Sequence, residues 1–243
     1  MKTIGLALMG FFFLAQSAAA LPTWSTLSVT TTPQNAPEVV AATDKLMSSA
    51  IGKQAPGRLL LQVHIADGDD PATHTFVPIY KSAADREAYM QKLVADPAWA
   101  DFEATIARIS QPVAQVVYRT LKSWGEVVDT DHVWLSHAFA VSDPPALFAA
   151  LEKLMASETG KKFPGQVHLS GVVAGGIAPV THMISVGYAS EAEMEAWFDS
   201  RVGSADWAAY LEVARASAQY LGGSMALDVK AWGSVSLGDL AAP

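Results

Sequence analysis

The chain has 243 residues, of which 51% are hydrophobic and 16% are charged, and its formal net charge is −8 at pH 7. This composition is that of a globular protein, because disordered chains are more polar and more highly charged. An acidic chain without a basic run is a poor partner for nucleic acid, whose phosphates are bound by clustered Lys and Arg. The length allows one large domain or two domains of about 100 residues.

The first 20 residues have the pattern of a secretory signal peptide. Lys2 precedes an apolar run from Ile4 to about Ala15, and Ala18-Ala19-Ala20 forms a site of small residues for cleavage. The alternative is a membrane anchor, but the run is too short to span about 30 Å of hydrocarbon. We therefore expect cleavage after Ala20, a periplasmic or secreted protein, and no membrane association after cleavage.

The chain contains no cysteine. Burial of the core, and no disulfide, must therefore stabilise the exported protein. A thiol nucleophile, an iron–sulfur cluster, a cysteine zinc site and a lipoprotein anchor are all excluded.

An internal repeat with a spacing of 108 residues covers most of the chain. Lys45-Leu46-Met47 recurs as Lys153-Leu154-Met155, and roughly thirty positions are identical without a gap between residues 27–125 and 135–233. Chance would give about six, so the chain is a tandem duplication. The predicted organisation is a signal peptide (1–20), a first repeat (21–125), a linker (126–133) and a second repeat (134–243).

Each repeat is predicted to contain the same elements in the same order. Strands have alternating or continuous apolar residues, helices have apolar residues at helical spacing, and Gly and Pro separate them. In the first repeat we expect strands at 26–31, 58–66, 73–80 and 116–124, with helical segments at 37–49 and 82–110. In the second we expect strands at 134–141, 166–174, 181–188 and 225–232, with helical segments at 145–157 and 190–220.

The long helical segment of each repeat begins at a capping box, Ser82-x-x-Asp85 or Ser190-x-x-Glu193. It is expected to break near Asp96-Pro97 and near Gly203-Ser204. The resulting order, βαββαβ, defines a ferredoxin-like unit, whose sheet has helices on one face only. Two copies could cover each other's bare faces, sheet against sheet, so the predicted fold class is α+β.

In element order, repeat length and a tryptophan after the helical break, as in Asp96-Pro97-Ala98-Trp99, the chain resembles the dimeric α+β barrel superfamily. That superfamily includes stress-responsive A/B barrel proteins and antibiotic-biosynthesis-type monooxygenases. The resemblance implies a face-to-face α+β barrel with a cavity, but it implies no particular reaction. Members include monooxygenases, isomerases, cyclases and haem-handling proteins.

His74 and His182 are the first candidates for a site, because each follows a threonine at the start of the third strand of its repeat. Alternation places Tyr80 on the same face as His74, and Tyr188 on the same face as His182. A histidine and a tyrosine on an apolar face suit the wall of a ligand cavity. The alternative is structural: repetition in both copies also fits a role in fixing the fold.

Two further candidates occur in only one copy or near a strand end. His64 could form a two-histidine site with His74 if the strand register allowed it, and Trp134 is expected near the mouth of the barrel. No HExxH or comparable spacing of metal ligands is present. We therefore predict no metal site, and neither a nucleotide-binding loop nor a nucleophile elbow is found.

The sequence therefore favours an exported protein that binds a small apolar or aromatic molecule between its sheets. The alternatives are a cofactor-independent monooxygenase or cyclase, a haem-handling protein, and an interaction module with a filled barrel. No cofactor is required by the sequence, although haem fits the resemblance. Self-association remains open, as does the question of whether the protein is an enzyme.

Overall fold

The computed structural model of the chain describes residues 21–176 and 179–242, so the expected signal peptide lies outside the described residues. The first repeat has the βαββαβ order, with its second helical segment divided into two helices. Its elements are β1 (Thr23–Thr31), α1 (Ala36–Ser48), a short 3-10 turn (Gly52–Gln54), β2 (Gly57–Ala66), β3 (His74–Tyr80), α2 (Ala83–Leu93), α3 (Pro97–Ile109) and β4 (Ser110–Gly125).

The second repeat reproduces the first at the spacing of 108 residues. Its elements are β5 (Val133–Val141), α4 (Pro144–Ala156), a 3-10 turn (Gly160–Lys162), β6 (Gln166–Gly175), β7 (His182–Tyr188), α5 (Glu191–Ser200), α6 (Ala205–Ser217) and β8 (Ala218–Trp232), followed by a 3-10 turn (Gly238–Leu240). The predicted fold class, two tandem ferredoxin-like units, is confirmed.

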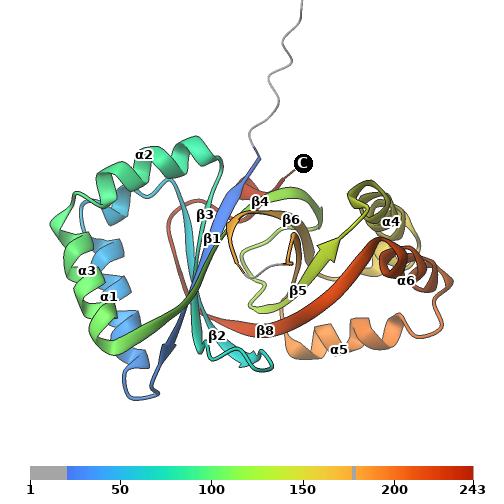
Figure 1. Cartoon of the computed structure of the whole chain (residues 1–243), viewed down its shortest axis with the longest axis horizontal. Helices are drawn as coiled ribbons and strands as arrows, with labels where there is room; N and C mark the ends of the chain where they lie inside the picture. Colours follow the sequence, from blue (N-terminus) through green and yellow to red (C-terminus); the bar gives the residue numbers. More distant parts are fainter. Residues whose placement is uncertain (1–20, 177–178, 243) are drawn as a thin grey trace, which may run out of the picture.

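The described strands form a closed antiparallel barrel in the order β1-β3-β2-β8-β5-β7-β6-β4. The two repeats join at two seams, where β2 pairs with β8 and β4 pairs with β6. The helices lie outside this barrel on two opposite sides, with α1, α2 and α3 over one repeat and α4, α5 and α6 over the other (Figure 1). Closure leaves none of these eight described strands with an edge open for pairing with another chain.

Alternation along the strands assigns each side chain to the helical layer or to the barrel interior. Val29, Leu61 and Phe76 face the helices and form one core with α1, α2 and α3. Leu169 and Ile184 do the same in the second repeat, where they pack with α4, α5 and α6. Each repeat therefore has its own apolar core between sheet and helices, as expected for a strand period of two.

Helix boundaries follow local capping chemistry. The side chains of Ser82, Asp96, Ser190 and Ser204 each accept a hydrogen bond from a backbone N–H in the first turn of the helix that follows. These caps account for both predicted breaks, because each new helix starts at its own polar cap.

The last strand of each repeat is longer than the sequence predicted. We expected strands from Val116 and Met225, whereas β4 begins at Ser110 and β8 at Ala218. The extra residues pair with β1 and β5, with a bulge in each ladder. Pairing across the sheet overrides local preference there, and it places Tyr220 in a strand rather than in a helix.

The interior of the barrel contains buried polar side chains joined by hydrogen bonds. Gln62 of the first repeat and Trp134 of the second both donate to the Asp228 carboxylate, at 3.0 Å and 3.2 Å. His168 bonds Ser123 at 2.8 Å through Nδ1 and Gln166 at 2.9 Å through Nε2. Burial lowers the pKa of His168 to about 4 and raises the pKa of Asp228 to about 6.

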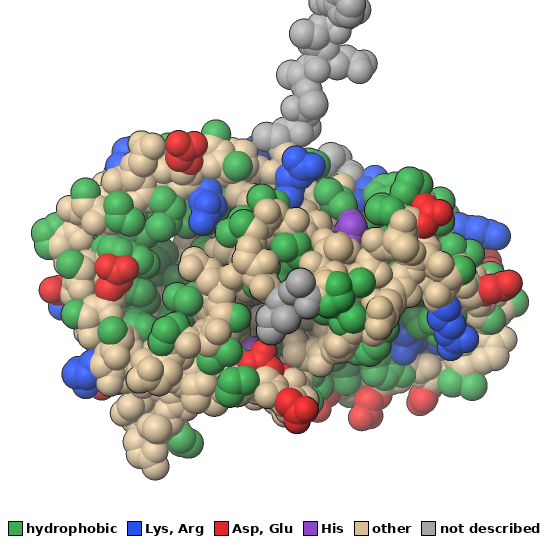
Figure 2. Space-filling view, viewed as in Figure 1, with side chains coloured by type: hydrophobic (Ala, Val, Ile, Leu, Met, Phe, Trp, Pro, Cys, Tyr) green, Lys and Arg blue, Asp and Glu red, His purple; other side chains and the backbone are tan. Residues whose placement is uncertain are grey.

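The outer surface carries charged side chains of both signs, scattered around the periphery of the face in Figure 2. Ion pairs on this surface, such as Lys45–Asp101 at 3.1 Å, are exposed and contribute little to stability. Among the helices of residues 21–176 and 179–242, none is long and apolar enough to cross a membrane.

Replacing Asp228 by Asn should change how stability depends on pH. In the unfolded chain an Asp has a pKa of about 4, and in the barrel burial raises the pKa of Asp228 to about 6. The native state therefore loses up to about 3 kcal/mol as pH rises through this window. In thermal unfolding, the midpoint of Asp228→Asn minus that of the wild type should rise between pH 4 and pH 6.5 and then stay level.

An exposed carboxylate provides the control for this measurement. Asp101→Asn removes a carboxylate whose side chain is 65% exposed, so it measures the effect of losing a surface charge over the same window. A difference for Asp228→Asn that rises no more than that of Asp101→Asn would show that the Asp228 carboxylate is not desolvated in the barrel.

Candidate functional site

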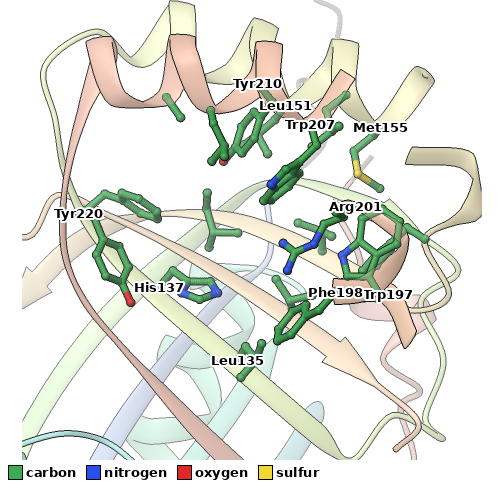
Figure 3. A pocket seen from close by; sticks show the side chains of 18 of the residues that line it. Leu135, His137, Leu151, Met155, Trp197, Phe198, Arg201, Trp207, Tyr210 and Tyr220 are labelled. Atoms are coloured by element: carbon green, nitrogen blue, oxygen red, sulfur yellow. The ribbon is translucent and has the colours of Figure 1, made fainter. Parts of the chain in front are cut away.

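A cavity of about 390 Å³ lies in the second repeat, between the sheet and its helices. Its walls come from β5, β6, β7 and β8 on one side and from α4, α5 and α6 on the other, and most of its lining side chains are apolar or aromatic. Figure 3 shows the aromatic rings around it. The expected position for a ligand was between the two sheets, so the structure places the cavity in a different layer.

Two substitutions between the copies help to explain why the cavity occurs in the second repeat. Phe76, whose ring packs edge-on against Phe102 at 5.9 Å in the first repeat, corresponds to Ile184 in the second. Ile106 is buried in the first core and corresponds to Ala214. Both Ile184 and Ala214 line the cavity. At these two positions the smaller side chains of the second repeat leave space that the larger side chains fill in the first repeat.

Arg201 brings a positive charge to this apolar cavity. It follows the last residue of α5, and its guanidinium lies 4.2 Å from the centre of the Trp207 ring and 4.3 Å from that of Phe198. Its Nε atom is buried and has no hydrogen-bond partner among the residues that the structure describes. Within residues 21–176 and 179–242, no carboxylate forms an ion pair with Arg201. Burial lowers the pKa of Arg201.

His137 faces the same cavity from β5, as Figure 3 shows. Its ring lies 6.0 Å from that of Tyr220 on β8. Gly223 makes room for this pair, because a Cβ there would lie 2.6 Å from the Tyr220 hydroxyl and 3.0 Å from His137 Nδ1. Burial, and then the charge of Arg201, lower the pKa of His137. The imidazole is therefore neutral at pH 7.

Two tyrosine side chains also line the cavity. Tyr188 is only 1% exposed, and burial raises its pKa. Tyr210 on α6 has its pKa raised to about 12 by burial. Both are therefore neutral phenols at pH 7, which can donate a hydrogen bond but carry no charge. Arg201 supplies the positive charge beside them.

Of the six residues singled out by sequence, Tyr188 lines the cavity and the other five lie elsewhere. His74 and His182 each bond through Nδ1 to the preceding threonine, at 3.0 Å and 2.9 Å. The hydroxyls of Thr73 and Thr181 in turn accept hydrogen bonds from backbone N–H groups of β1 and β5. This arrangement is the same in both copies, so it accounts structurally for the repeated Thr-His pair.

The remaining three candidates lie apart from the cavity. Tyr80 is buried in the first core beside Tyr89, with ring centres 6.3 Å apart. Trp134 is buried in the barrel interior, where its ring stacks on His168. His64 also faces the interior, with hydrogen bonds to Asp67 at 2.9 Å and Thr75 at 2.7 Å.

The pairing of β2 with β3 does not bring His64 and His74 together on one face of the sheet. Val63 pairs directly with His74, so His64 and His74 point to opposite faces of the sheet. Within residues 21–176 and 179–242, no group of three or more metal-ligating side chains is found. Two polar side chains of the cavity, Arg201 and His137, were not among the residues selected from the sequence. The available signal was their departure from the first copy, which has Leu93 and Val29 at these positions.

Comparison with known proteins supports the fold. The sequence matches no family model, and it matches no curated protein. Among solved structures, a candidate monooxygenase from Fusobacterium nucleatum aligns with a TM-score of 0.59 and 13% identity, over 89% of this chain and 97% of the other. An anthrone oxidase-like protein aligns with a TM-score of 0.58 and 14% identity, over 92% and 96%. A haem-binding protein from Thermus thermophilus aligns with a TM-score of 0.56 and 10% identity, over 86% and 92%.

These likenesses extend over most of both chains, so the protein has the dimeric α+β barrel fold that the sequence resemblance implied. Here the two halves of the barrel come from one chain. At such low identity the likeness concerns the fold, and it assigns no activity.

Proposed function

We propose that this protein binds a small, largely aromatic or apolar molecule in the cavity of its second repeat. The observation that carries the proposal is an apolar cavity of about 390 Å³, lined by aromatic side chains and containing few polar groups. Cavities of roughly 300–1,000 Å³ with this lining are typical of small-molecule sites. The first repeat, with the same fold, fills the corresponding positions with Phe76 and Ile106.

Aromatic ligands suit this lining better than aliphatic ones. Trp207 and Tyr210 have ring centres 5.2 Å apart on α6, and Phe163 packs edge-on against Trp197 at 5.1 Å. Faces and edges of several rings are thus available to a flat guest, which gains from stacking beyond the area that it buries.

Filling the cavity with the side chains of the first repeat should abolish binding. The variant Ile184→Phe/Ala214→Ile restores at two positions the residue types of Phe76 and Ile106. Titration with N-phenylnaphthylamine, a neutral aromatic dye that fluoresces in apolar sites, should give an affinity at least about tenfold weaker than for the wild type. The thermal midpoint should rise, because filled cavities usually add about 0.5–2 kcal/mol.

The matched control is Val213→Ile, which enlarges an exposed side chain next to Ala214. It should leave dye affinity unchanged. If the wild type does not bind the dye, or if the filled variant binds as tightly as the wild type, the cavity is not the binding site.

Haem is a second candidate ligand, favoured by the position of His137. His137 would hold the haem iron through its neutral imidazole, and Arg201 and Arg215 at the same cavity would pair with the propionates. The chemistry of these side chains therefore fits the group. A neutral imidazole is also the base that a cofactor-independent oxygenase or cyclase would need, which moves that role from His74 and His182 to His137.

Addition of haemin to the protein distinguishes this candidate from a dye-like ligand. Binding through His137 should give a sharp Soret band that shifts or disappears in His137→Val, the residue type of the first copy. His132→Val serves as the control, because His132 does not line the cavity. If haemin added to the wild type and to His132→Val gives only the spectrum of free haemin, haem is not a ligand of this cavity.

We further propose that the protein acts outside the cytoplasm after its signal peptide is removed. The support is the charged, apolar and small-residue pattern of residues 1–20. Native mass spectrometry of protein recovered from the periplasm of an expression host should show a chain that begins at Leu21, together with any retained small molecule. A chain that retains residues 1–20 would contradict cleavage.

A further inference from the structure

We infer that the ligand of the second-repeat cavity carries an acidic group, a carboxylate or a sulfonate, that pairs with Arg201. This inference rests on the proposed function and specifies the chemical class of its ligand. It follows from three features of the Arg201 guanidinium: its position at the cavity, the aromatic rings around it, and the lack of a carboxylate partner among the described residues.

The cation is held in a setting that lacks a counter-charge. Arg201 is partly buried. Withdrawing a charge from water is costly unless it is paired and hydrogen-bonded, so arginines in such settings are normally matched by carboxylates. The described residues supply no carboxylate to Arg201, and its Nε has no acceptor. An acidic group on a ligand would supply both the charge and the acceptor.

The surrounding rings position the guanidinium for such a pair. Stacking on Trp207 and Phe198, at 4.2 Å and 4.3 Å, orients the planar group without using its N–H donors. These donors therefore remain available, and an arginine fork matches the two oxygens of a carboxylate. In Figure 3 the guanidinium of Arg201 points towards the cavity, on the side of His137.

Comparison of the two repeats shows that the fold does not require an arginine or a histidine at these positions. At the position of Arg201 the first repeat has Leu93, which is 5% exposed in an apolar core. At the position of His137 it has Val29, which is 2% exposed. The same fold is thus built with two apolar side chains where the second repeat has a cation and an imidazole, next to the cavity.

Two dyes that differ by a single acidic group provide the test. Anilinonaphthalene sulfonate is N-phenylnaphthylamine with one added sulfonate, so the ratio of their affinities measures recognition of the anion. In the wild type we expect the sulfonate dye to bind roughly tenfold to a hundredfold more tightly than the neutral dye. In Arg201→Leu this preference should fall below about threefold.

Two more variants control for charge and for structure. Arg201→Lys keeps the charge but not the fork, so it should retain part of the preference. Arg108→Leu removes an exposed arginine of the first repeat, so it should leave both affinities unchanged. Equal affinities of the two dyes in the wild type, or a preference that survives in Arg201→Leu, would overturn the inference.

Binding of the neutral dye shows whether the inference about the acidic group fails alone or whether the proposed function fails with it. If the wild type binds the neutral dye, and binding is lost when the cavity is filled, the cavity is a ligand site whatever the sulfonate dye does. If neither dye binds the wild type, both the proposed function and this inference fail.

Discussion

The structure depends on one constraint: a ferredoxin-like sheet has helices on one face and must cover the other. The duplicated chain meets this constraint by joining its two sheets edge to edge, β2 to β8 and β4 to β6, into a closed barrel. The bare faces become an interior, in which polar side chains form hydrogen-bonded sets around Asp228 and His168. Each layer of helices then shields an apolar core of its own, and the cavity lies within one of these layers.

The two copies show how one fold can support both a filled core and a cavity. In the first repeat, Phe76 and Ile106 fill the space between sheet and helices. In the second, Ile184 and Ala214 leave these two positions smaller. Within residues 21–176 and 179–242, no carboxylate forms an ion pair with the Arg201 guanidinium that borders the cavity. Such a site reduces stability, since it gives up apolar contacts and desolvates a charge. Functional sites commonly carry a cost of this kind, which the rest of the fold must offset.

Much of the architecture could be predicted from the sequence, because the repeat shows every element twice. Capping boxes, Gly-Pro turns and strand periodicity are local signals, and they gave the element order and the breaks at Asp96 and Ser204. The extended starts of β4 and β8 could not be predicted, because they depend on pairing with distant strands.

The site was harder to predict than the fold. Shared residues such as His74 and His182 attracted attention, yet their hydrogen bonds to Thr73 and Thr181 join strands in both copies. Arg201 and His137 differ between the copies, but only the structure shows that the end of α5 and the middle of β5 bring them to one cavity. Identity between duplicates reports what the fold needs, whereas differences indicate where one copy has changed its role.

The joining of both halves of the barrel in one chain also affects how the protein behaves on dilution. Where two separate subunits must pair to cover their sheets, the folded fraction falls as the protein becomes scarcer. Here residues 126–132 connect β4 to β5, so the second sheet is always present at a high local concentration. Barrel closure is therefore a unimolecular step, independent of how many copies of the protein are nearby. The site in the second repeat would persist even where the protein is very dilute.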